Sequence, residues 1–179
     1  MAQIFINYRR DGGAYTAALL DELLSKHFGE RQVFRAAKSI IVGSDYVAAI
    51  LEAVRGCDVM LVIVDDCWLG KFETENYNSS PDSDWVLREI EEAFKCERIV
   101  IPVLLSGVNR LREADLPAAL AKLATLQYLR FDYRNVQQDS NYMAEQLVRV
   151  CPGITEERDL HPQRSGWFWS ALNRVCRSR

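Results

Sequence analysis

The chain has 179 residues, of which 49% are hydrophobic and 26% are charged, and its net charge at pH 7 is −3. This balance excludes an intrinsically disordered chain and gives no sign of nucleic-acid binding. The length suffices for one domain with an appendage, whose core needs neither disulfides nor metal.

Short apolar runs alternate with amphipathic stretches along the chain, a pattern typical of a wound parallel sheet. Strands are predicted at residues 3–8, 32–34, 58–64, 98–105 and 127–131. Helices are predicted after Asp11-Gly12-Gly13, at 45–54, from about 85 onward, in a short form from Leu116-Pro117, and at 140–150; the loops between them include 35–44 and 65–82. The run DVMLVIV at 58–64 has the apolar continuity of a central strand covered on both faces.

Five strands, each followed by a helix, predict a three-layer, flavodoxin-like α/β fold with a five-stranded parallel sheet of order 2-1-3-4-5. Ligands of such sheets bind outside the carboxyl ends of the strands, near the switch between strands 1 and 3. This rule gathers residues 8–10, the segment 65–68 and the helix that contains Trp85 and Glu89 around one crevice.

Trp85 and Glu89 stand four residues apart, where a long polar segment gives way to a helix. Four residues slightly exceed one helical turn, so both side chains project from the same face. The spacing of Val86, Ile90 and Ala93 defines a different, apolar face, which predicts that Trp85 and Glu89 stay outside the core. Either Trp85 covers the helix start and Glu89 is solvated, or the pair serves a ligand.

The chain lacks the residues that several common functions require. The chain has no G-x-G-x-x-G or P-loop motif, and its two histidines, His27 and His161, argue against a Ser/His/Asp triad or a histidine zinc site. A two-component receiver would share the fold, but residues 7–10 (Asn-Tyr-Arg-Arg) cannot hold a divalent cation as carboxylates do, and no Lys follows Phe131. We therefore expect no metal site and no bound cofactor.

The five cysteines form no C-x-x-C pair and are odd in number, which favours a reducing compartment. No apolar run approaches the ~20 residues that a membrane span requires, and no basic and apolar leader precedes the first strand. We therefore expect a cytoplasmic location.

Five sequence blocks together resemble a TIR domain of bacterial type. They are IFINYRR at 4–10, Val33-Phe34 with Gly43 and Tyr46 downstream, Cys57 to Val64, Asp84-Trp85 to Glu89-Ile90, and Ile99 to Leu104 with Pro102 inside. The match covers about residues 1–150 and keeps the order and spacing of the blocks. We therefore take residues 1–152 as a TIR domain and 153–179 as a C-terminal tail.

This resemblance implies a module that self-associates and, in many members, cleaves the nicotinamide glycosidic bond of NAD. Glu89 matches the catalytic glutamate of the family, and Trp85 matches an aromatic residue near the nicotinamide ribose. The resemblance also implies that Tyr8 and Arg9 line the pocket and that Phe34 and Gly43 bound the loop that contacts neighbouring TIR domains. Together with Arg10 and Trp68, which the strand-end rule places at the same crevice, these residues are expected to bind substrate. Family members often carry an Asp shortly after the Val-Phe pair, and here that place is Ala36, between Arg35 and Lys38.

The chemistry of NAD is compatible with a single carboxylate. Nicotinamide leaves as a neutral molecule, so that no general acid is needed, and an ionised Glu can stabilise the oxocarbenium-like transition state. Capture by water gives ADP-ribose and internal capture gives a cyclic ADP-ribose, and the sequence does not choose between them. In bacteria such proteins resemble antiphage signalling components with a downstream effector. The alternative is a catalytically silent adaptor that docks to other TIR domains through residues 35–44.

The tail has a charged, linker-like segment at 155–162, followed by an apolar stripe flanked by arginines. The stripe comprises Trp167, Phe168, Ala171, Leu172 and Val175. We expect a short basic amphipathic helix that packs on the domain or contacts a partner, in preference to an anionic membrane surface.

Overall fold

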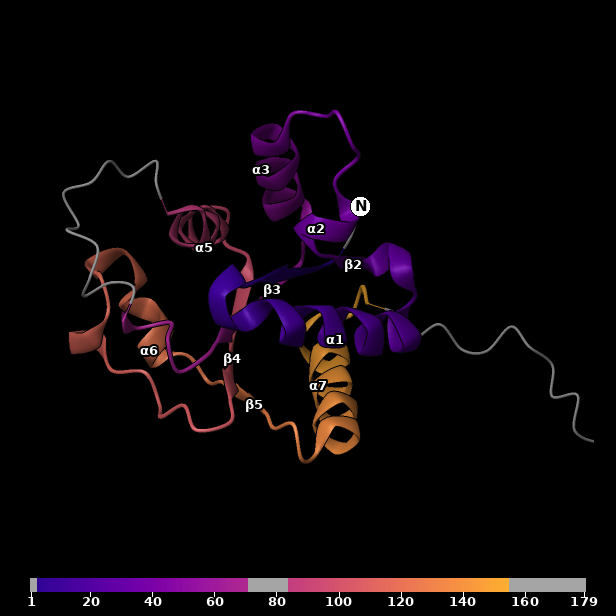
Figure 1. Cartoon of the computed structure of the whole chain (residues 1–179). Coiled ribbons are helices and arrows are strands. Elements are labelled where there is room, and N and C mark those ends of the chain that lie inside the picture. Colours follow the sequence, from indigo (N-terminus) through magenta and orange to yellow (C-terminus); the bar gives the residue numbers. More distant parts are fainter. Residues whose placement is uncertain (1–2, 71–83, 155–179) are drawn as a thin grey trace, which may run out of the picture.

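The computed structural model describes residues 3–70 and 84–154, and these form an α/β domain around one parallel sheet (Figure 1). The strands are β1 (Ile4–Asn7), β2 (Val33–Phe34), β3 (Val59–Val64), β4 (Ile99–Leu105) and β5 (Leu129–Phe131). All neighbours pair in parallel, in the order β2-β1-β3-β4-β5. The predicted flavodoxin-like strand order is confirmed. The predicted tail helix and most of the predicted loop 65–82 lie outside the described residues.

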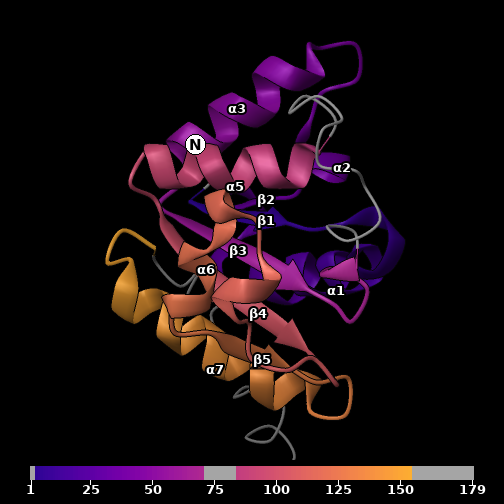
Figure 2. The same ribbon diagram turned by 90° about the vertical axis from the view of Figure 1, so that its left-hand side faces the viewer.

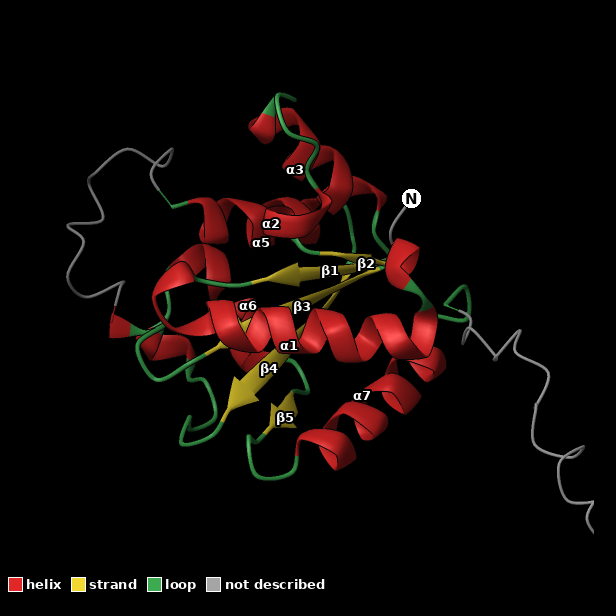
Figure 3. Cartoon of the chain, turned by 45° about the vertical axis from the view of Figure 1, so that its right-hand side comes forward, coloured by secondary structure: helices red, strands yellow, loops and turns green. Residues whose placement is uncertain are grey.

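Helices cover both faces of the sheet and produce three layers. They are α1 (Arg10–Phe28), α2 (Ala36–Ser39), α3 (Tyr46–Gly56), α5 (Trp85–Lys95), α6 (Lys122–Thr125) and α7 (Val136–Val150), with 3-10 turns at Glu30–Gln32, Glu113–Asp115 and Ala118–Leu120. Helices α1 and α7 lie on one face, and α3, α5 and α6 lie on the other (Figures 1 and 2). In Figure 3 α1 crosses in front of the sheet, and the arrowheads of β1 and β4 point toward the side where α1 begins. Within the described part of the chain, no helix has the length and apolar character to cross a bilayer.

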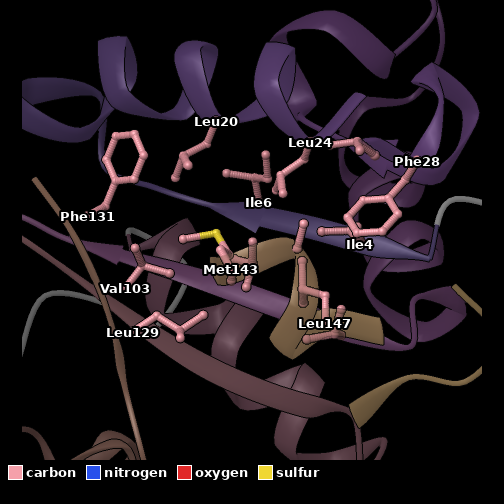
Figure 4. Packing of buried hydrophobic residues seen from close by; sticks show 14 of the residues in the cluster. Ile4, Ile6, Leu20, Leu24, Phe28, Val103, Leu129, Phe131, Met143 and Leu147 are labelled. Carbon is pink, nitrogen blue, oxygen red and sulfur yellow. The ribbon is translucent and has the colours of Figure 1, made fainter. Parts of the chain in front are cut away.

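Alternate strand residues supply the two halves of the core, because successive side chains of a strand point to opposite faces. Ile4 and Ile6 of β1 pack with Leu20 and Leu24 of α1 and with the apolar face of α7 (Figure 4). Phe5 points the other way, into the cluster formed with α3 and α5. All six residues of β3 are buried, which explains its unbroken apolar run.

Two helices begin earlier than the sequence predicts, and one helix was not predicted. Helix α1 begins at Arg10, so that the Asp-Gly-Gly segment, after which the helix was predicted, lies within its first turn. Helix α2 lies inside the predicted loop 35–44, and α7 begins at Val136 rather than at Ser140. The polar first turn of α7 conceals its start, because Val136 is the only apolar residue there and the three that follow are polar.

Gly12 allows the start of α1 to lie against the end of β3. A Cβ atom at Gly12 would stand 2.6 Å from the side-chain carboxyl of Asp65, which is itself buried. No side chain fits between the helix and this carboxyl group. The close approach brings Tyr8, Arg9 and Arg10 to the edge of the sheet where β3 also ends.

Replacing Gly12 by Ala tests this packing. In a helix interior, Ala is about 1 kcal/mol more stabilising than Gly. The overlap with Asp65 should nevertheless dominate, so that Gly12→Ala lowers the free energy of unfolding by about 1–3 kcal/mol in chemical denaturation. Gly153→Ala, whose Cβ would meet its nearest atom at 3.6 Å, is the control and should be neutral. In an Asp65→Ala background the cost of Gly12→Ala should largely disappear; an equal cost in both backgrounds would contradict the account.

Candidate functional site

A cavity of about 440 Å³ opens at the carboxyl end of β1, on the α3 and α5 side of the sheet. The loop after β1, the start of α1, helix α2, and the first turns of α3 and α5 enclose it. Its lining residues are Phe5, Ile6, Tyr8, Arg9, Arg10, Asp11, Ala36, Ala37, Tyr46, Asp84, Trp85, Val86 and Glu89. The volume is in the range of small-molecule sites, and the position is where a wound sheet of this order binds ligands.

Glu89 is the most deeply buried charged group of this cavity, with 7% of its surface exposed. Its Oε2 accepts a hydrogen bond of 2.7 Å from Nδ2 of Asn7, the last residue of β1. The same amide group also lies 3.3 Å from the carbonyl oxygen of Val86 and donates to it. This burial corrects the expectation that Glu89 stays outside the packed face of α5. Ile90 and Ala93 are buried as predicted, but the strand end supplies a polar partner that lets Glu89 turn inward as well.

Burial raises the pKa of Glu89 to about 7, because the charged form loses its hydration. The hydrogen bond from Asn7 opposes this by favouring the carboxylate, whereas the nearby charge of Asp84 raises the pKa further. The protonated form of Glu89 therefore persists closer to neutral pH than that of an ordinary glutamate. A carboxyl group with such a perturbed pKa in a cavity is a typical candidate for a functional site.

Asp84 makes two contacts at the start of α5. Its side chain caps the helix by accepting a hydrogen bond of 3.2 Å from the backbone N–H of Leu87. It also forms an ion pair with Arg9, whose guanidinium lies 5.8 Å from the centre of the Trp68 ring. The loop after β1 is thereby tied to the first turn of α5, across the mouth of the cavity.

Trp85 and Tyr46 form an aromatic corner in the cavity wall. Their rings meet edge to face, at 6.3 Å between centroids and 81° between planes, and the guanidinium of Arg88 lies 4.8 Å from the Trp85 ring centre. Tyr46 belongs to the sequence blocks, but the sequence did not identify it as a site residue. Its position directly after the helix-capping Asp45, at the start of a helix predicted from the sequence, is the signal that could have identified it.

The structure brings together five of the eight residues expected from the sequence to form the site. Tyr8, Arg9, Arg10, Trp85 and Glu89 all line the cavity. The other three lie elsewhere.

Phe34, Gly43 and Trp68 do not line this cavity. Phe34 stacks on Phe5 with ring centroids 5.1 Å apart. Gly43 has a φ of 86° in an exposed turn, where a Cβ atom would have no neighbour within 4 Å, and Trp68 is fully buried in the apolar cluster beneath α5. Strand-end position alone did not reveal that the indole of Trp68 points into the core.

A group of possible metal ligands lies beside the cavity rather than in it. The ligand atoms of Asp65, Asp66 and Cys67 fall within 4.8 Å of one another. Asp65 already accepts a hydrogen bond of 2.8 Å from the backbone N–H of Cys67, and its carboxyl group is pressed against Gly12. These contacts indicate that Asp65 has a structural role at the end of β3.

Comparisons with known proteins agree with this architecture. The fold resembles the TIR domains in the structure of the activated Roq1 resistosome directly recognizing the pathogen effector XopQ, at 16% identity, with a TM-score of 0.56 and coverage of 83% of this chain and 98% of that chain. A prokaryotic SEFIR domain is similar at 20% identity and a TM-score of 0.53, covering 93% and 100%. A metazoan TIR-STING receptor from C. gigas, in complex with 2',3'-cGAMP, is similar at 19% identity and a TM-score of 0.51, covering 79% of this chain and 39% of that one.

At such identities the structural likeness concerns the fold alone. The comparison with curated proteins finds no match. A family model described as TIR domain matches residues 4–148, which is most of the chain. Together with the strand order and the position of the cavity, this match shows that the chain belongs to the TIR domain family.

Proposed function

We propose that this TIR domain cleaves the bond between nicotinamide and ribose in NAD, with Glu89 as its catalytic carboxylate. The observation that carries the proposal is a buried, hydrogen-bonded carboxyl group in a cavity of ligand size at the switch point of the sheet. TIR domains that share this fold include NAD-cleaving enzymes, as the sequence resemblance implies.

The reaction needs little from the protein beyond one anionic group. The C1′–N bond breaks and its electron pair passes to the pyridinium nitrogen, so that nicotinamide departs uncharged and needs no proton. Positive charge then develops on the ribose, where the carboxylate of Glu89 stabilises it. Attack of water at C1′, with loss of a proton, gives ADP-ribose; attack by a nucleophile of the same molecule gives a cyclic ADP-ribose.

The substrate itself favours the ionised form of Glu89. The nicotinamide ring of NAD is a cation, and an opposite charge within a few ångströms lowers the pKa of a carboxyl group. The binding of NAD therefore shifts Glu89, whose pKa is raised by burial in the free protein, toward the carboxylate form. Trp85 and Tyr46 provide the aromatic wall against which the nicotinamide nucleoside is expected to rest.

An exposed apolar loop favours a second, compatible function in self-association. Ile41 is 79% exposed and Val42 is fully exposed, in the turn that contains Gly43. Apolar side chains presented in this way commonly mark protein contacts. A catalytically silent TIR adaptor would use this surface only to bind other TIR domains. An enzyme in bacterial immune signalling would use it to assemble an active form that acts on a downstream effector.

Glu89→Gln tests the catalytic proposal. The amide keeps the size of the side chain but cannot stabilise a cation, so that nicotinamide release from NAD should fall by at least ~100-fold. The measurement is mass spectrometry of the products at dilute and at high protein concentration, which reveals any dependence on assembly and separates ADP-ribose from its cyclic forms. Glu91→Gln, on the same helix but outside the cavity lining, is the matched control. Equal turnover by the wild type and Glu89→Gln would refute the assignment, and an inactive wild type at every concentration would favour the adaptor.

The pKa of Glu89 predicts opposite pH trends for activity and stability. Activity requires the carboxylate, so kcat/KM should rise with pH through about 7. Stability should fall over the same range, because between pH 4.5 and 7 the folded protein holds a proton that the unfolded chain has released. The expected loss is about 3 kcal/mol from about pH 4 to about pH 8. Urea denaturation of wild type and Glu89→Gln across this range measures it, and identical slopes for the two proteins would contradict the raised pKa.

A further inference from the structure

A third buried carboxylate, besides Glu89 and Asp65, is Asp21 of α1, which lies outside the cavity and is 2% exposed. Its Oδ2 accepts a hydrogen bond of 2.9 Å from Nε of Arg35. Its Oδ1 accepts one of 3.2 Å from Nζ of Lys38 and one of 3.2 Å from the hydroxyl of Ser25. One carboxylate thus holds two cationic side chains from the segment that follows β2.

The core does not require a charge at this place. The other large buried side chains of α1, those of Leu20, Leu24 and Phe28, are apolar. A buried ion pair is seldom more stabilising than well-packed apolar side chains of similar volume, although it fixes the relative position of its members. The contribution of Asp21 therefore depends on the segment that its partners, Arg35 and Lys38, hold in place.

The partners of Asp21 flank a wall of the cavity. Arg35 and Lys38 stand on either side of Ala36 and Ala37, both of which line the cavity. Helix α2 has four residues, none of them fully buried, and so short a helix does not persist without outside contacts. Arg35 also interacts with Tyr8, another lining residue, so the same cluster reaches two walls of the cavity.

We infer that Asp21 is a positioning residue, which fixes α2 as a wall of the substrate cavity through Arg35 and Lys38. The inference rests on the proposed NAD cleavage for its effect on activity. Asn7 and Glu89 belong to β1 and α5, and the hydrogen bond between them does not involve the Asp21 cluster, so the catalytic carboxylate keeps its place when the wall is loosened. Asp21 therefore acts on substrate binding and leaves the chemical step unchanged.

Asp21→Asn tests the kinetic part of the inference, because the amide keeps the size of the side chain and removes its charge. We expect KM for NAD to rise about tenfold, the scale of one weakened charged hydrogen bond, with kcat within about twofold of wild type. Glu22→Gln is the matched control: this neighbour on α1 is paired with Lys26 at the exposed surface and should leave both constants unchanged. Because Asp21 and Arg35 share one contact, Asp21→Asn with Arg35→Met should raise KM by less than the product of the two single effects.

Hydrogen exchange provides a readout that does not depend on catalysis. In Asp21→Asn the amides of residues 36–44 should exchange at least several-fold faster, while those of α5 keep their wild-type rates. Unchanged exchange at 36–44 would overturn the inference, as would faster exchange throughout α1 and α5, which would mean a general loss of stability. Faster exchange at 36–44 with an unchanged KM would overturn the link to substrate binding. If the wild type releases no nicotinamide, the proposed function fails, and exchange alone decides whether Asp21 holds α2.

Discussion

The hydrogen bond from Asn7 to Glu89 joins residues 82 positions apart and decides how α5 meets the sheet. A carboxyl group buried at this depth needs a donor, since an unsatisfied polar group in the interior costs about 1–3 kcal/mol or more. With Asn7 as donor, α5 can turn Glu89 inward beside Ile90 and still place Trp85 at the cavity wall. The burial that makes this hydrogen bond necessary also raises the pKa of Glu89, and the bond from Asn7 only partly opposes that rise. Packing and chemistry at this site thus share one cause.

The architecture could be predicted because it depends on local patterns. The unbroken run that ends at Val64 could only be a covered strand, and the alternation of strands and helices leaves few sheet orders. The start of α1 could not be predicted in the same way. Gly12 and Gly13 indicate a turn by local preference, and only the position of Asp65, much later in the chain, shows why a helix needs glycine there. Helix α2 was missed because distant Asp21 holds it, and four residues leave no periodic pattern.

The location of the site could be predicted from the sequence, but the directions of its side chains could not. The rule for wound sheets located the crevice, and the family resemblance pointed to Glu89, Trp85 and the residues after β1. Neither gave the direction of the Trp68 side chain, which is set by space in the apolar cluster, nor the burial of Glu89, which is set by Asn7. Polar contacts between distant segments decide these details, and a sequence does not display them. In this chain the basic residues around Ala36 have such a contact of their own, with Asp21.

Because burial raises the pKa of Glu89 to about 7, part of the free protein carries a proton on this carboxyl group near neutral pH. In the proposed function, the binding of a cationic ring would lower this pKa and release part of that proton into the solvent near neutral pH. The apparent enthalpy of binding would then vary with the ionisation enthalpy of the buffer, even for a ligand that is never cleaved. The burial of one glutamate therefore couples ligand capture to the proton concentration of the surroundings before any bond is broken.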